Sequence, residues 1–139
     1  AALLNKEINM DEIRPGFVGT AEIIVGTNDT APRVGSGRII VLATPVMIGL
    51  MEEAALDAVE HLLPDARQSL GTHLDVSHTA ATPTGMKVTA RAELVKVEGR
   101  KLFFNVTARD EVEEIGSGQH QRVVVNAQAF VDRVSKKLR

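Results

Sequence analysis

Two kinds of hydrophobic spacing divide this chain of 139 residues. Between residues 44 and 63, apolar residues recur at helical spacing on one broad face, which predicts a long, mostly buried helix. Thr44-Pro45 marks its start and Pro64 its end, because proline is favoured at the first helical position and disfavoured further inside. The face consists of Met47, Leu50, Met51, Ala54, Ala55, Ala58 and Leu62.

Apolar and polar residues alternate along most of the second half, as is typical of β-strands with one buried face. The pattern predicts antiparallel strands joined by turns, with one further strand near the N-terminus. Gly116 and Gly118 in the last strand predict a bulge or a close backbone approach. Strands are expected at residues 17–25, 70–79, 86–94, 101–109 and 115–125, a loop at 26–37 and a terminal helix at 127–138.

One long buried helix beside several long antiparallel strands is an α+β layout, with the helix on one face of the sheet. Strands of about ten residues can curl around such a helix. The length is that of one ordinary domain, and the sequence has no internal repeat. We therefore expect a single domain over residues 1–139.

The composition restricts the chemistry through the residues that are missing. The chain has no Cys, Trp or Tyr, which excludes disulfides, thiolate metal sites and thiol nucleophiles. Sixteen Lys and Arg against eighteen Asp and Glu give a net charge of −2, so we expect no nucleic-acid or membrane partner. No stretch approaches the roughly 20 apolar residues of a membrane span, and no signal peptide is recognisable. A cytoplasmic location is therefore expected.

Three side chains are candidates for acid, base or nucleophilic chemistry. His78 shares the apolar parity of its strand and is either a core histidine or an acid/base group. Glu52, two turns into the predicted helix, is either solvated at the rim or a buried base with a raised pKa. Thr44 is either an N-cap or a hydroxyl at a helix start, where carbonyl oxygens are stabilised. The parity expected to face the core comprises Leu70, Thr72, Leu74, Val76 and His78.

A hydroxyl, a carboxylate and an imidazole are the parts of an acyl-transfer site, although spacing alone does not show that they meet. His73 has the opposite parity to His78 and is expected to face solvent, while His120 and Arg122 share a parity on the last strand. No set of histidines and carboxylates has the spacing of a metal site, so no metal is expected.

Three sequence blocks, taken together, resemble the fluoroacetyl-CoA thioesterase family, a group of acyl-CoA thioesterases with the hotdog fold. The first block is Ala43-Thr44-Pro45-Val46-Met47-Ile48-Gly49-Leu50-Met51-Glu52. The second covers residues 69–85, and the third covers residues 97–100 together with 113–122.

The resemblance implies a long central helix wrapped by a curved antiparallel β-sheet, and a homodimer or higher assembly with sites at the interface. It also implies hydrolysis of a short-chain, substituted or unsubstituted acyl-CoA to the free acid and coenzyme A, which is part of the substrate, so that no cofactor is needed. The family's catalytic Thr, Glu and His fall on Thr44, Glu52 and His78. Its carbonyl-contacting Gly falls on Gly71 and its pocket Arg on Arg122.

The chain departs from the family's fluoroacetyl enzyme just before the first block. That enzyme has a lid segment with Phe, whereas residues 31–42 contain none, and Pro45 replaces a Gly. The resemblance therefore implies a thioesterase whose acyl group is unassigned. Two alternatives on the same fold are a non-catalytic acyl-CoA-binding module and an enoyl-CoA hydratase or dehydratase that uses His78 with Glu52.

Overall fold

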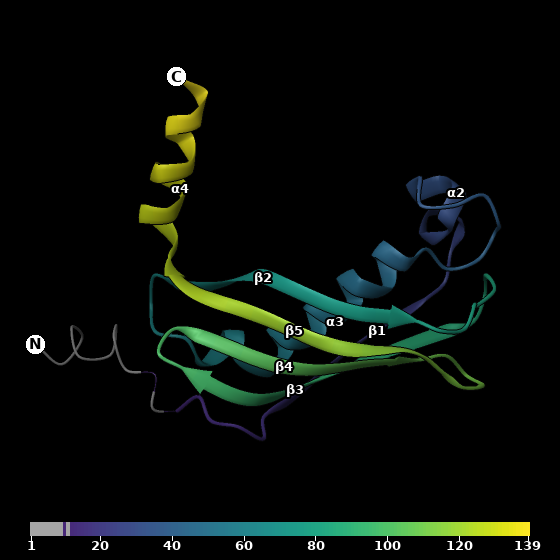
Figure 1. Ribbon diagram of the computed structural model, residues 1–139, viewed down its shortest axis with the longest axis horizontal. Helices are drawn as coiled ribbons and strands as arrows, with labels where there is room; N and C mark the ends of the chain where they lie inside the picture. The colour runs from purple at the N-terminus through teal and green to yellow at the C-terminus, as the bar shows by residue number, and fades with distance from the viewer. Residues whose placement is uncertain (1–9, 11) are drawn as a thin grey trace, which may run out of the picture.

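The computed structural model describes residues 10 and 12–139, and over these residues one antiparallel five-stranded sheet curls around a single long helix, α3 (Thr44–Val59) (Figure 1). The strand order across the sheet is β1-β3-β4-β5-β2, so β1 and β2 form its edges. The predicted layout of a long helix wrapped by an antiparallel sheet is confirmed. The strands are β1 (Val18–Ile24), β2 (Arg67–His78), β3 (Lys87–Glu98), β4 (Lys101–Arg109) and β5 (Glu114–Asn126).

Helix α3 fills the concave side of the sheet with its apolar face. Its buried residues are Met47, Leu50, Met51, Ala54, Ala55, Ala58 and Val59. The small side chains let β1 pack closely, because a Cβ atom at Gly19 would overlap the backbone of Ala54 and Ala58. The predicted last turn is a 3₁₀ turn, η2 (Glu60–Leu62), which precedes Pro64.

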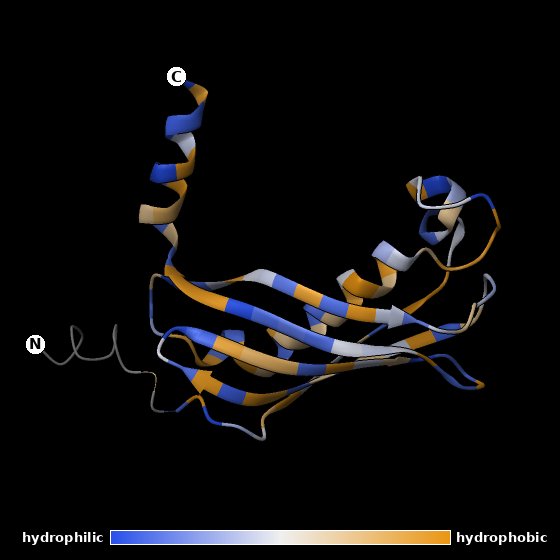
Figure 2. Ribbon diagram, in the orientation of Figure 1, coloured by the Kyte–Doolittle hydropathy of each residue, from blue (hydrophilic) through white to orange (hydrophobic). Residues whose placement is uncertain are grey.

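The alternation of apolar and polar residues holds along the central strands and fails in β2. In β4, buried and more exposed residues alternate along the whole strand, and the hydropathy colours in Figure 2 alternate with them. In β3 they alternate as far as Leu94, after which the pairing with β4 shifts register at Val95. In β2, the pairing with β5 shifts register between Gly71 and His73, so Thr72 is an extra residue. The bulge reverses the parity: Ser69 and Gly71 lie on the helix side before it, and Leu74, Val76 and His78 lie there after it. The prediction that Leu70 and Thr72 face the core is therefore wrong.

The segment predicted as a loop before α3 contains two short helices, η1 (Thr27–Asp29) and α2 (Ala31–Val34). α2 ends at Gly35, whose φ of +91° is a left-handed conformation that glycine adopts without strain. Backbone hydrogen bonds from Ala31 N to Val41 O (2.9 Å) and from Leu42 N to Thr82 O (2.9 Å) hold the segment that follows α2 against the body.

The C-terminal helix is α4 (Ala127–Ser135), followed by η3 (Lys136–Leu138), and it stands away from the sheet (Figure 1). Its N-terminus is capped by Asn126, whose side-chain oxygen accepts a hydrogen bond from Ala129 N (2.9 Å). Among the described residues, no helix is long and apolar enough to cross a membrane.

Candidate active site

The hydroxyl of Thr44 and the imidazole of His78 are in direct contact. Thr44 is the first residue of α3, and the N-cap position belongs to Ala43, with no side-chain hydrogen bond to the helix start. Thr44 Oγ1 instead lies 2.7 Å from His78 Nδ1, at the end of β2. The Thr44 hydroxyl is therefore engaged by an imidazole and does not serve as the cap.

Burial lowers the pKa of His78 below its ordinary value of 6.5, so the ring is neutral at neutral pH. Its Nε2 atom is buried and has no hydrogen-bond partner among the described residues. A neutral imidazole at hydrogen-bond distance from a hydroxyl is able to accept the proton of that hydroxyl or of a water molecule beside it. The Thr44–His78 pair thus has the geometry and the protonation state of a nucleophile and its base.

Thr44 and His78 form part of the wall of a pocket of about 360 Å³. Its other walls are the segment between α2 and α3 and the turn that follows β2. The volume is that of a site for a small ligand. The N-terminal end of α3, which carries a partial positive charge, is at the same wall and favours developing negative charge on a substrate oxygen.

A second polar cluster surrounds Glu52, two turns further along α3. Glu52 Oε2 is 3.8 Å from Arg122 Nη1, and the side chains are 38% and 6% exposed. The carboxylate is thus neither fully solvated nor fully buried, while the neighbouring Glu53 is exposed. A Cβ atom on Gly71 would be only 2.6 Å from Glu52 Oε2, so the absence of a side chain at Gly71 keeps room beside the carboxylate.

Arg122 is held firmly in this cluster by β2. Its Nε donates to Ser69 Oγ (2.8 Å) and its Nη2 donates to Ser69 O (3.0 Å). Ser69 Oγ in turn donates to Glu60 Oε1 (2.6 Å). The guanidinium is therefore fixed in direction and faces two carboxylates, which compensates its burial.

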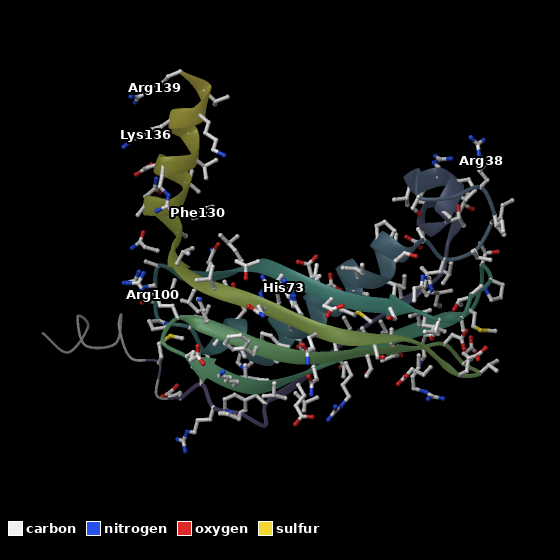
Figure 3. The ribbon with its side chains drawn as sticks, viewed as in Figure 1. Arg38, His73, Arg100, Phe130, Lys136 and Arg139 are labelled. Atoms are coloured by element: carbon white, nitrogen blue, oxygen red, sulfur yellow. The ribbon has the colours of Figure 1, made fainter. Side chains whose placement is uncertain are left out.

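His120 belongs to the same cluster and was not among the site residues predicted from the sequence. It is fully buried, its Nδ1 donates to the backbone oxygen of His73 (2.9 Å), and its Nε2 accepts from Arg122 Nη1 (3.2 Å). Figure 3 shows His73, on the outer edge of the sheet, and its side chain is exposed as predicted. The shared parity of His120 and Arg122 indicated that the two lie together, but nothing in the sequence placed them beside Glu52.

The buried His120 gives a testable pH dependence of stability. Burial, with Arg122 as a further cause, lowers the pKa of His120, and burial lowers that of His78. As the pH falls below about 6.5, these histidines therefore bind protons in the unfolded chain before they do so in the folded chain. The free energy of unfolding decreases in this range, by at most about 1.4 kcal/mol per pH unit for each histidine. Urea unfolding between pH 5 and pH 8 measures this slope. His120→Gln should reduce the slope, and an unchanged slope would contradict the assignment.

Within one chain, the candidate residues form two separate groups rather than a single site. Thr44 contacts His78, and Glu52 contacts Arg122 beside Gly71, but eight residues of α3 separate Thr44 from Glu52, which is a rise of about 12 Å. Glu52 of the same chain is therefore out of hydrogen-bond reach of the Thr44–His78 pair. In the described part of the chain, no three His, Cys, Asp or Glu side chains are grouped so that they could hold a metal ion.

Comparison with known proteins gives a consistent assignment. Residues 25–128 match the family model described as fluoroacetyl-CoA-specific thioesterase. A curated fluoroacetyl-CoA thioesterase from Streptantibioticus cattleyicolor is 50% identical over 97 residues, which are 70% of each chain. The family-model match spans the site residues described above.

Solved structures extend the likeness to the fold. A fluoroacetyl-CoA thioesterase superposes with a TM-score of 0.86 at 41% identity, covering 91% of this chain and 98% of that one. A mutant of the same enzyme in complex with acetyl-CoA superposes with a TM-score of 0.85 at 40% identity, covering 90% and 98%. A hot-dog-like protein from Thermanaerovibrio acidaminovorans, 23% identical, has a TM-score of 0.82 over 90% of this chain and 93% of its own. The hotdog fold expected from the sequence is confirmed.

Proposed function

This chain belongs to the fluoroacetyl-CoA-specific thioesterase family and is a thioester hydrolase, and on that premise we propose that it converts a short-chain acyl-CoA, substituted or unsubstituted, and water into the free acid and coenzyme A. The observation that carries this proposal is the 2.7 Å contact between Thr44 Oγ1 and His78 Nδ1 in the wall of a pocket. The acetyl-CoA complex of a relative supports an acyl-CoA as the ligand.

In the proposed reaction, His78 takes a proton from the attacking oxygen, which is that of Thr44 or of a water molecule that Thr44 orients. The carbonyl carbon gains this oxygen and loses the sulfur of coenzyme A, and the proton passes to the thiolate. The N-terminal end of α3 stabilises the negative charge that develops on the carbonyl oxygen. In the direct-attack route, a water molecule then releases the acid from Thr44.

We assign Glu52 the second proton-transfer role, and Gly71 and Arg122 the positioning of the thioester carbonyl. The cluster supports these roles, because the fixed guanidinium of Arg122 lies beside the Glu52 carboxylate and orients it, and Gly71 leaves its backbone accessible. No cofactor is required, since hydroxyl, imidazole and carboxylate supply the necessary groups. We also propose that the chain acts in the cytoplasm, as expected from its sequence.

A homodimer would join the two groups of residues into one site. β2 is an edge strand, and its residues from Gly71 to Asp75 are all exposed, although long edge strands are usually covered or paired. If two copies pair antiparallel along β2 about a two-fold axis between Leu74 and Asp75, Gly71 comes opposite His78 of the partner subunit. Glu52, which adjoins Gly71, then approaches the partner's Thr44–His78 pair. We therefore propose two composite sites per dimer.

The proposed function is tested with a panel of acyl-CoA esters of two to six carbons and a thiol-reactive dye. Release of coenzyme A from at least one ester is expected. If acyl-CoA esters raise the melting temperature but are never hydrolysed, the chain is a binding module. If a short enoyl-CoA gains water while no thiol appears, the chain is a hydratase. Either outcome would contradict the proposal.

A further inference from the structure

One charged side chain stands in the wall of the pocket beside the Thr44–His78 pair. Arg38 lines this pocket together with the neighbouring Ile39, and both residues are exposed. Figure 3 shows Arg38 on the segment that follows α2, at the opposite end of the molecule from α4. The pocket thus has an arginine within its own wall, on the same side of the fold as the proposed reacting groups.

The position of Arg38 is set by anchors on both sides of it. Gly35 N and Ser36 N both donate to Ala31 O (2.9 Å and 3.0 Å), and Val41 O accepts from Ala31 N (2.9 Å). The loop that holds Arg38 is therefore closed at its base by backbone hydrogen bonds. The backbone of Arg38 therefore stays at the pocket, while its guanidinium can turn within the reach of the side chain.

The charge of Arg38 is not compensated by the surrounding residues. Among the described residues that line the pocket, none is acidic, and His78 is neutral at neutral pH. The sequence has no Asp or Glu between residues 30 and 51 or between residues 76 and 92, the two stretches that supply the walls. No hydrogen bond or ion pair joins Arg38 to another part of the described chain. Together with the N-terminal end of α3, Arg38 makes the pocket electropositive.

We propose that Arg38 binds an anionic group of the thioester substrate, so that the site favours thioesters that carry this anion over thioesters that lack it. The inference rests on the proposed function and specifies its substrate class. The planar guanidinium matches a carboxylate or a phosphate with two parallel hydrogen bonds, which a neutral side chain cannot do. The anion is either a carboxylate at the far end of the acyl group or a phosphate of coenzyme A.

Four thioesters separate these two sources. Succinyl and butyryl groups have the same length and differ in the terminal carboxylate, and each is tested on coenzyme A and on N-acetylcysteamine, which has no phosphate. Values of kcat/KM are measured for wild type, Arg38→Gln and Arg38→Lys. Arg33→Gln is the matched control, since Arg33 is an exposed arginine of α2 that lines a different pocket.

If the acyl carboxylate is the ligand, Arg38→Gln lowers the succinyl-to-butyryl ratio at least about tenfold on both carriers. If a phosphate is the ligand, Arg38→Gln lowers the ratio of coenzyme A to N-acetylcysteamine esters by a similar factor for both acyl groups. Arg38→Lys, which keeps the charge, retains more of either ratio than Arg38→Gln. The inference is overturned if both ratios in Arg38→Gln stay within about twofold of wild type, as they should in Arg33→Gln.

Failure of the proposed function would be visible separately, as a wild-type chain that hydrolyses none of the four thioesters. In that case the dissociation constants of succinyl-CoA and of coenzyme A are measured by calorimetry for wild type and Arg38→Gln. A weakening of at least about tenfold for one of these ligands supports the anion-binding role of Arg38. Equal dissociation constants in the two proteins overturn it.

Discussion

Thr44→Ala is expected to lower kcat by about 10²–10⁴-fold in a protein that remains folded. The substitution removes the hydroxyl that lies 2.7 Å from His78 Nδ1 and leaves the imidazole without its partner. An N-cap threonine would instead cost about 0.5–2 kcal/mol of stability on replacement, but the cap position of α3 is Ala43. The free energy of unfolding should therefore change by less than about 1 kcal/mol.

Thiol release measures kcat, and urea unfolding measures stability. Thr44→Ser retains a hydroxyl and should recover part of the lost activity, while Thr107→Ala, on the central strand β4, should behave as wild type. Unchanged turnover in folded Thr44→Ala would remove Thr44 from the catalytic machinery. A loss of activity that follows a loss of folded protein would point to a structural role instead.

Glu52→Gln is expected to have the next largest effect, a fall in kcat of about 10²–10³-fold. Glutamine keeps the size of the side chain beside Gly71 but can neither accept a proton nor pair as an anion with Arg122. Glu53→Gln is the matched control, because Glu53 is the next residue of the same helix and is exposed. It should retain wild-type turnover.

A purely structural role for Glu52 makes a different prediction from a catalytic one. Arg122 also bonds to Ser69, which bonds to Glu60, so the guanidinium keeps partners when Glu52 is neutralised. If Glu52 served only to pair with Arg122, Glu52→Gln would lower the free energy of unfolding and leave kcat nearly unchanged. That combination of results would refute the proton-transfer role.

Elements with a strong local pattern could be predicted from the sequence. The apolar face of α3 and the alternation in β3 and β4 arise from neighbours three, four or two residues apart, so the pattern itself encodes the buried face. The three sequence blocks also indicated the family. The same blocks contain Thr44, Glu52 and His78, of which Thr44 and His78 are in contact within one chain.

Features that depend on register between distant segments could not be predicted. The extra residue at Thr72 reverses the parity of β2, and no local signal distinguishes it from a regular strand. The position of His120 against Arg122 and Glu52 depends on the pairing of β5 with β2 and on the placement of α3 beneath them. The contact between Thr44 and His78 likewise depends on where the end of β2 lies against the start of α3.

The central claim is that each active site combines the Thr44–His78 pair of one protomer with Glu52 of its partner. Mixing Thr44→Ala and Glu52→Gln subunits, after unfolding and refolding together, tests this claim directly. Half of the dimers are then mixed, and each has one intact site if the sites are shared between chains, so about a quarter of wild-type activity should return. If each site lies within one chain, every chain in the mixture is defective, and the activity would remain at the level of the two separate variants.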